Sequence, residues 1–445
     1  MKHLFYFCYL LLLITACNKS KTSENDNTAI PKLLQRSEAT MQGKEWDQVQ
    51  SLYAENAKLV RENPNDVEAL LNLSEIFIQE ARVTGESTHY YNATLNVLGR
   101  VLKSPSKNKD QEFRALANKA SVLLSLHQFQ VALETSQQAV ALNPYNAQVY
   151  GTLVDAHVEL GNYEEAVQTS DKMISIRPDL RSYSRVSYLR QIYGDNKGAI
   201  EAMNLAAEAG YPGAENTEWA RVTLGDLLVN AGALPQAEQV YQLALTNRPQ
   251  YPYAEIGLAK VEKAKGNYDK AIQHTETAIR IISLPGFVDM LSDLYELKGN
   301  TEKATEIRGD IVKLLEEAQA EEPKDALVKH NGARELAMGY LKNNDLDKAL
   351  ENALIDLKMR PENIDANELA AWIYYLKGDY NNAKVHADKM LKTNVKNPNT
   401  LYKAGLIYAK TGDNKKSDTL LAEAKTISPY IDGLLTKYAT TAMPN

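Results

Sequence analysis

The chain has 445 residues, of which 44% are hydrophobic and 24% are charged, and its formal net charge is −7. This composition supplies enough apolar side chains to bury a core. A general nucleic-acid-binding protein needs a basic surface, so the acidic balance argues against nucleic acid as a partner. The two cysteines, Cys8 and Cys17, both lie near the N-terminus, so no disulfide framework can hold the body of the chain.

The N-terminus has the pattern of a secretion signal. Lys2 precedes an apolar run from Leu4 to Ile14, which is too short to cross a bilayer but fits a signal-peptide core. The segment ITAC at 14–17 resembles a bacterial lipobox, which implies cleavage before Cys17 and two or three acyl chains on that residue. An ordinary secretory signal with an incidental cysteine is the alternative. We expect a lipoprotein signal peptide over 1–16 and a lipidated cysteine with a disordered tether over 17–30.

Short phrases such as LGNYEEA, KAKGNYDKA and YLKGDYNNA recur along the rest of the chain. They define units that begin near residues 66, 113, 147, 180, 218, 252, 285, 330, 364 and 398, and six of the nine steps are 33 or 34 residues. A period of 34 residues resembles the tetratricopeptide repeat (TPR), and the resemblance covers about residues 66–429. It implies an all-α TPR solenoid, a right-handed superhelix of about ten helix–turn–helix repeats. Residues 31–65 and 430–445 are predicted to form N- and C-terminal capping helices.

Each recurring residue type has a mechanical role in such a unit. A left-handed residue ends the first helix, a small residue lets the second helix pack closely, and a proline stops the second helix. We expect His127 and Asn344 to take the place of the turn glycine in their units. The turn glycines are Gly161, Gly194, Gly232, Gly266, Gly299, Gly378 and Gly412. The small residues are Ala132, Ala166, Ala199, Ala237, Ala271, Ala304, Ala349, Ala383 and Ser417.

Two irregular units carry specific predictions. In the first unit the extra residues fall in the segment 80–89, which is expected to lengthen the turn between the helices. In the unit that begins near 285, the second helix is expected to continue through residues 311–322. The phrase IFIQEARVTGESTHYY, near the start of the array, is similar to one found in TPR lipoproteins of Bacteroidetes.

No pattern in the sequence indicates catalysis or a bound metal. The histidines of the body fall in different repeats, without a His-Glu-x-x-His motif and without cysteine partners. They are His89, His127, His157, His274, His330 and His386. Phosphate-binding loops, dinucleotide-binding glycine patterns and the Gly-x-Ser-x-Gly motif are also missing. The sequence therefore predicts no catalytic residue, no cofactor, no metal site and no enzymatic activity.

The resemblance to TPR proteins implies a concave groove lined by the first helices. The groove positions of the TPR pattern correspond here to Arg181, Arg185, Tyr188, Trp219, Tyr253, Lys260, Trp372, Tyr375, Tyr402 and Lys403. Arginine and aromatic side chains dominate binding energy at interfaces, so these residues are the predicted partner-binding site. The competing interpretation is that an aromatic at any of these positions only packs against its neighbours.

The leading functional hypothesis is a lipid-anchored envelope scaffold that binds a protein or peptide in its groove. A component of an envelope assembly complex is one form of this hypothesis. The arginines favour an acidic partner. The alternative is a carbohydrate-binding surface lipoprotein, but such proteins carry large insertions, and the longest step here exceeds 34 residues by only 47 − 34 = 13. Polar residues 18–21 lack an acidic cluster, which favours an outer-membrane anchor with the body in the periplasm.

Overall fold

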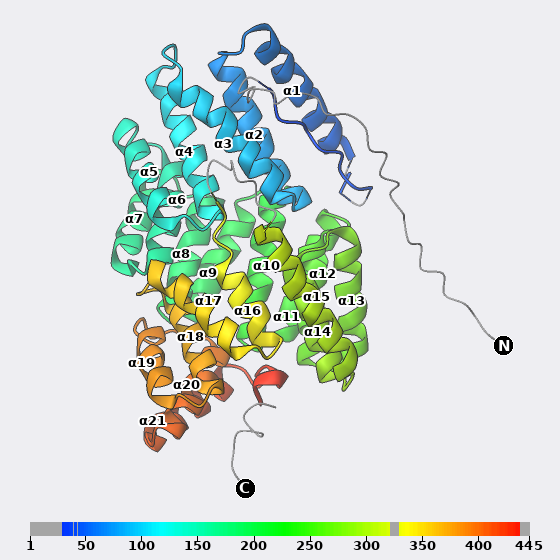
Figure 1. The fold of residues 1–445 in the computed structure, drawn as a ribbon, viewed down its shortest axis with the longest axis vertical. Coiled ribbons are helices and arrows are strands. Elements are labelled where there is room, and N and C mark those ends of the chain that lie inside the picture. The colour runs from blue at the N-terminus through cyan, green and yellow to red at the C-terminus, as the bar shows by residue number, and fades with distance from the viewer. Residues whose placement is uncertain (1–28, 39, 42, 321–328, 437–445) are drawn as a thin grey trace, which may run out of the picture.

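The computed structural model describes residues 29–38, 40–41, 43–320 and 329–436, and the regular secondary structure of these residues is entirely helical (Figure 1). The predicted signal peptide, Cys17 and nearly all of the predicted tether lie outside the described residues. None of the described helices combines the length and the hydrophobicity that crossing a lipid bilayer requires.

Within the described residues, ten consecutive helix pairs follow an N-terminal helix, α1 (Gly43–Glu62), and we number these pairs as units 1 to 10. Their first helices are α2 (Val67–Thr84), α4 (Lys109–Ser125), α6 (Ala147–Leu160), α8 (Leu180–Ile192), α10 (Glu215–Asn230), α12 (Pro252–Ala264), α14 (Pro285–Leu297), α16 (Ala333–Lys342), α18 (Ile364–Leu376) and α20 (Pro398–Lys410). Their second helices are α3 (Ser87–Lys103), α5 (Phe129–Leu142), α7 (Tyr163–Ile176), α9 (Asn196–Glu208), α11 (Leu234–Asn247), α13 (Tyr268–Ile281), α15 (Thr301–Ala320), α17 (Leu346–Met359), α19 (Tyr380–Met390) and α21 (Asn414–Ile427). The predicted all-α solenoid of about ten units is confirmed.

The recurring residues take the positions that the sequence predicts. The seven turn glycines all have φ between 73° and 89°, and His127 and Asn344 adopt the same left-handed conformation with φ of 57° and 60°. The eight alanines five residues later are all fully buried, because the second helix of each unit packs on the first at that point. The turn and the small residue together set the geometry of each helix pair.

Three details differ from or refine the sequence expectations. The turn of unit 1 is not lengthened, because α2 continues to Thr84 and only Gly85 and Glu86 separate it from α3; the extra residues lengthen the helices instead. Helix α15 does run on, as predicted, to Ala320. In the predicted N-terminal cap, residues 43–62 form one helix and the preceding described residues are not helical. At the C-terminus, residues 433–436 form a single helical turn.

The superhelix repeats after six units, so that its second turn lies directly against its first. The turn of unit 2 contacts the start of unit 8, where the Asn331 N–H donates to the Leu126 carbonyl at 3.1 Å. The same relation joins unit 3 to unit 9 and unit 4 to unit 10. We call this line of contacts the seam; one side is formed by residues 126–128, 161–163, 194–196 and 232, and the other by residues 329–331, 360–364, 394–396 and 428–429.

Backbone approaches backbone closely along the seam. A Cβ added at Gly161 would lie 2.4 Å from the carbonyl carbon of Glu362, and one at Gly194 would lie 2.4 Å from the carbonyl oxygen of Asn394. Turn glycines away from the seam, such as Gly378, have no atom within 4 Å of that position. Glycine is therefore needed at Gly161 and Gly194 for space as well as for the left-handed backbone.

Buried polar contacts hold the two sides of the seam together. The Arg360 guanidinium, which is 2% exposed, pairs with Asp356 at 2.7 Å through two nitrogens and donates across the seam to Glu159. The backbone N–H of Ile364 donates to the Tyr163 hydroxyl at 2.8 Å. The pair between Arg360 and Asp356 lies on one side of the seam, but the bonds to Glu159 and Tyr163 exist only while both sides are in contact, so opening the seam removes them.

The C-terminal segment after α21 crosses the inside of the superhelix. Asp432 accepts a hydrogen bond from Lys263 of α12 at 2.7 Å, and its backbone N–H donates to Asn399 of α20 at 3.0 Å. Leu435 is buried in the same hydrophobic cluster as Trp372 and Tyr375. This segment therefore fills the concave side of units 9 and 10 and leaves the concave side of the first units open.

A candidate binding cavity in the concave face

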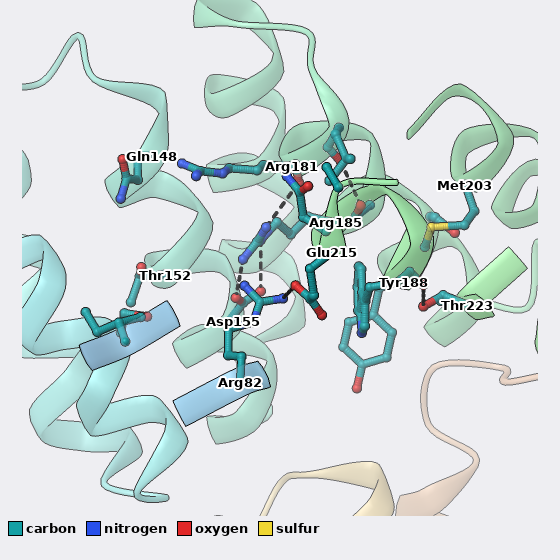
Figure 2. A pocket seen from close by; sticks show the side chains of 18 of the residues that line it. Arg82, Gln148, Thr152, Asp155, Arg181, Arg185, Tyr188, Met203, Glu215 and Thr223 are labelled. Atoms are coloured by element: carbon teal, nitrogen blue, oxygen red, sulfur yellow. Dashed lines mark hydrogen bonds and ion pairs between the residues drawn. The ribbon is translucent and has the colours of Figure 1, made fainter. Parts of the chain in front are cut away.

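The first helices of units 1 to 5 surround a concave cavity of about 1180 Å³. Helices α2, α4, α6, α8 and α10 contact one another in this order and form its inner wall (Figure 2). The second helices of these units form the outer layer. The cavity is thus built by the same pairing of helices that defines the units.

Four of the predicted groove residues line this cavity together. Arg181, Arg185 and Tyr188 come from α8 and Trp219 comes from α10. The side chains of Tyr188 and Trp219 are 38% and 39% exposed, although each is a large aromatic group. The two rings supply apolar surface next to the arginines.

Two arginines of the wall are already paired with carboxylates. Arg185 binds Asp155 of α6 through two nitrogens, at 3.1 and 2.6 Å. Arg82 of α2 pairs with Glu215 of α10 at 3.1 Å, across the cavity (Figure 2). Arg185 is therefore part of the packing between neighbouring units, which is the structural role that the sequence could not separate from partner binding.

The remaining acidic residues of the lining are paired in the same way. Asp226 accepts from Lys260 at 2.8 Å, and Glu75 pairs with Arg114 at 3.0 Å. The carboxylate of Glu45 pairs with Arg36 at 3.0 Å and with Arg248 at 3.1 Å. Every carboxylate that lines the cavity thus has a cationic partner within the described part of the chain.

Arg181 is the exception in this neutralised wall. Within the described ranges no acceptor binds its guanidinium, and Figure 2 draws no contact from it. Burial in the concavity and the nearby Arg185, Arg177 and Arg82 lower the pKa of Arg181, while Asp179 opposes this effect. The Arg181 side chain is exposed to the solvent that fills the cavity, so an acceptor that enters the cavity can reach its guanidinium.

The other predicted groove residues do not lie in this cavity. Tyr253 is half-buried and packs against Tyr251 and Phe287, with ring centroids 5.3 and 5.6 Å apart. Trp372 and Tyr375 are 5% and 4% exposed and stack on each other at 5.0 Å, so the expectation that they face an open groove is wrong. The C-terminal segment occupies that side of units 9 and 10, and Trp372 and Tyr375 turn into the core.

The last predicted positions are also occupied by contacts within the chain. Tyr402 is partly buried against the hydrophobic cluster of units 9 and 10. Lys403 pairs with Glu368 at 2.7 Å, as Lys260 does with Asp226. Sequence reasoning missed Arg82 and Asp155, which the cavity wall includes. Both lie on first helices opposite a residue of opposite charge, Glu215 for Arg82 and Arg185 for Asp155, and this charge complementarity is the signal that could have identified them.

Comparison with known families agrees with the helix-pair geometry. Residues 123–193 and residues 222–283 each match a family model described as tetratricopeptide repeat. The first matched segment contains α5 to α8, and the second contains about half of α10 and all of α11 to α13. The first segment lies within units 2 to 4, which contribute to the cavity, and the second covers units 5 and 6, of which only unit 5 lines it.

Curated relatives match only short stretches of the chain. Small glutamine-rich tetratricopeptide repeat-containing protein 2 of Saccharomyces cerevisiae is 30% identical over 98 residues, which are 22% of this chain and 28% of the relative. The SGT1 homolog of Oryza sativa subsp. japonica is 34% identical over 76 residues, which are 17% of this chain and 20% of the relative. The chain thus spans less than a third of the length of either relative.

Several solved structures are similar to parts of the chain. A tetratricopeptide repeat protein from Parabacteroides merdae is 18% identical, with a TM-score of 0.39, over 58% of this chain and 98% of that one. PilW, a type IV pilus biogenesis factor, is 17% identical, with a TM-score of 0.39, over 48% of this chain and 96% of its own.

Proposed function

Because the chain is a tetratricopeptide repeat protein, we propose that it is a scaffold that binds a segment of a partner protein in the cavity of units 1 to 5. The observation that carries this proposal is the unpaired guanidinium of Arg181 in a wall whose other charges are neutralised. The proposal includes no enzymatic step.

The chemistry of the wall favours a partner segment that carries a carboxylate. Arg181 can donate charge-assisted hydrogen bonds to such a group, and these are about twice as strong as neutral ones. Tyr188 and Trp219 offer exposed aromatic surface to an apolar side chain beside it. A volume of about 1180 Å³ accommodates several residues of an extended peptide.

A photo-crosslinking experiment tests the location of the site. A photoreactive amino acid is placed at Trp219 inside the cavity and, as a control, at Tyr145, which is 80% exposed and lies outside it. We expect a discrete crosslinked partner from the Trp219 position alone. Equal crosslinking from both positions, or none from Trp219, would contradict a partner site in the cavity.

A pair of matched arginine variants tests the chemistry of the site. Arg181→Gln should weaken binding of the crosslinked partner at least tenfold, or about 1.4 kcal/mol. Arg177→Gln is the control, because Arg177 is four residues earlier, 73% exposed and outside the cavity. Both variants should keep the wild-type melting temperature. Displacement of the partner by oligosaccharides, with no effect of Arg181→Gln, would support the carbohydrate-binding alternative instead.

We further propose that this scaffold is anchored by lipid on Cys17 to the outer membrane and faces the periplasm. The proposal rests on the apolar run before Cys17 and on the lipobox-like segment at 14–17. As a random coil, the thirteen residues from 18 to 30 would reach on the order of 20 Å, so the cavity would stay close to the membrane. Labelling with a fatty-acid analogue should mark the wild type and spare Cys17→Ala; equal labelling of both would exclude the anchor.

A further inference from the structure

Three side chains with metal-binding chemistry meet at the seam between unit 2 and unit 8. His127 comes from the turn between α4 and α5, while His330 and Glu335 come from the start of unit 8. One ligand atom of each residue lies within 4.8 Å of the other two, and the imidazole centroids are 4.9 Å apart. About 200 residues of sequence separate the two sides, so only the six-unit pitch of the superhelix brings the residues together.

The backbone around this cluster is fastened on both sides of His330. The Gln128 amide donates to the Lys329 carbonyl at 2.8 Å, and the Asn331 N–H donates to the Leu126 carbonyl at 3.1 Å. These bonds fix the two turns relative to each other. The three candidate ligands therefore project from a rigid frame, which is what a binding site needs to hold its geometry.

His127 is oriented as metal-binding histidines usually are. Its Nδ1 lies 3.0 Å from the Asn331 carbonyl oxygen, and a hydrogen bond from Nδ1–H leaves the lone pair of Nε2 for a cation. The residue also has φ of 57°, at a turn position where most other units have glycine. A side chain in this conformation costs about 1–3 kcal/mol, which is more often found where the side chain has a function.

Glu335 completes the set with a carboxylate that is incompletely satisfied. Its Oε2 is buried and has no hydrogen-bond partner in the described part of the chain, while its Oε1 makes a separate contact of 3.7 Å with Nδ1 of His127, the nitrogen that faces Asn331. An oxygen in this state costs free energy that a cation would recover. Arg360 is nearby in the seam, but Asp356 and Glu159 already neutralise its charge.

We propose that His127, His330 and Glu335 bind a divalent cation of the zinc class across the seam. Two imidazoles and one carboxylate, with water in the remaining position, are a ligand set that Zn²⁺ accepts. Zinc–ligand bonds of about 2.0–2.2 Å require the ligand atoms to approach by about 1–1.5 Å. This approach requires side-chain movement within the cluster, where His330 is exposed and His127 and Glu335 are partly buried.

The bound cation would cross-link two turns of the superhelix. It would join the end of the first helix of unit 2 to the start of unit 8. Because the cation binds only when the seam is closed, it stabilises the closed superhelix by linkage. This inference does not depend on the proposed partner or on the lipid anchor.

Titration of Zn²⁺ into the full-length protein, with any affinity tag removed and the protein first treated with chelator, tests the proposal. We expect one zinc per chain by calorimetry and a rise in melting temperature on addition of zinc. His127→Gly, His330→Ala and Glu335→Gln should each weaken binding at least tenfold. His127→Gly suits the left-handed backbone, so loss of binding in this variant cannot be attributed to misfolding.

His274→Ala is the matched control, because His274 pairs with a single carboxylate at 2.6 Å and belongs to no such cluster. This variant should bind zinc like the wild type. Absence of stoichiometric binding in the wild type would overturn the proposal and leave a simple ion pair at the seam. Undiminished binding in the double variant His127→Gly/His330→Ala would overturn it as well, because the zinc would then be bound elsewhere.

Discussion

Substitution of Gly161 by alanine tests whether the two superhelical turns are in contact in solution. Gly161 and Gly378 end the first helices of units 3 and 9 with the same φ of 79°. An added Cβ at Gly161 would lie 2.4 and 2.5 Å from the carbonyl carbon and oxygen of Glu362, whereas the same atom at Gly378 meets nothing within 4 Å. Gly378→Ala is therefore an internal control for the backbone conformation alone.

The two variants should differ in their effect on the free energy of unfolding. Alanine in the left-handed conformation costs about 1–2 kcal/mol at either site. At Gly161 the methyl group also meets backbone atoms that cannot rotate away, and overpacking of this kind adds about 1–3 kcal/mol. We therefore expect about 2–5 kcal/mol for Gly161→Ala and about 1–2 kcal/mol for Gly378→Ala. Replacing glycine by alanine also lowers the conformational entropy of the unfolded chain, and this effect offsets an equal part of the destabilisation in both variants.

Hydrogen exchange is the appropriate assay, because long repeat arrays need not unfold in a single step. The amide of Ile364, which donates across the seam to Tyr163, reports directly on seam opening. Its exchange should accelerate at least tenfold more in Gly161→Ala than in Gly378→Ala, and small-angle scattering should show a larger radius of gyration for the former. If both variants exchange alike at Ile364, the turns do not touch in solution and the explanation of the seam is refuted.

Three further predictions concern packing, buried charge and pH. Gly257→Ala should destabilise the protein by about 1–3 kcal/mol, because the added methyl group would lie 2.2 Å from the ring of Tyr241. Gly309→Ala should stabilise the protein by about 0.5–1 kcal/mol, because an added methyl group there meets no atom within 4 Å and alanine favours the helix. Chemical denaturation measures both changes. Arg360→Ala should cost about 3–5 kcal/mol, because it leaves a buried carboxylate without its partner, and a melting temperature close to that of the wild type would contradict this. Burial alone would raise the pKa of Asp432, but its partner Lys263 holds this pKa below the ordinary value. The stability that the ionised carboxylate contributes is therefore complete above the ordinary pKa and is lost as the pH falls through the lower pKa of the folded state. The difference in unfolding free energy between the wild type and Asp432→Asn should shrink below about pH 4 and not above it.

The local structure of the units was predictable because it depends on residues close in sequence. A left-handed glycine, an alanine five residues later and a terminating proline act within one unit, and ten repetitions make each signal clear. The turn of unit 1 was placed wrongly because extra residues can lengthen a helix as easily as a loop. Propensity alone does not separate the two outcomes in the segment 80–89.

The candidate site was predictable only in part. Arg181, Tyr188 and Trp219 were identified because groove positions recur at fixed offsets within a unit, and the structure brings them together. Trp372 occupies an equivalent position, but the C-terminal segment covers it there. The contact of His127 with unit 8 depends on the pitch of the superhelix, which arises from small rotations between all intervening units. No local sequence pattern predicts the total of these rotations.

The six-unit pitch also constrains how this chain can evolve. In an open array each unit contacts only its neighbours, so loss or duplication of one unit leaves distant units undisturbed. Here Gly161 of unit 3 meets the start of unit 9, so deletion of one intervening unit would present it with residues suited to Gly194. Every pair across the junction would then be mismatched at once. Recombination between repeats, which adjusts the length of other solenoids, should be selected against in this one.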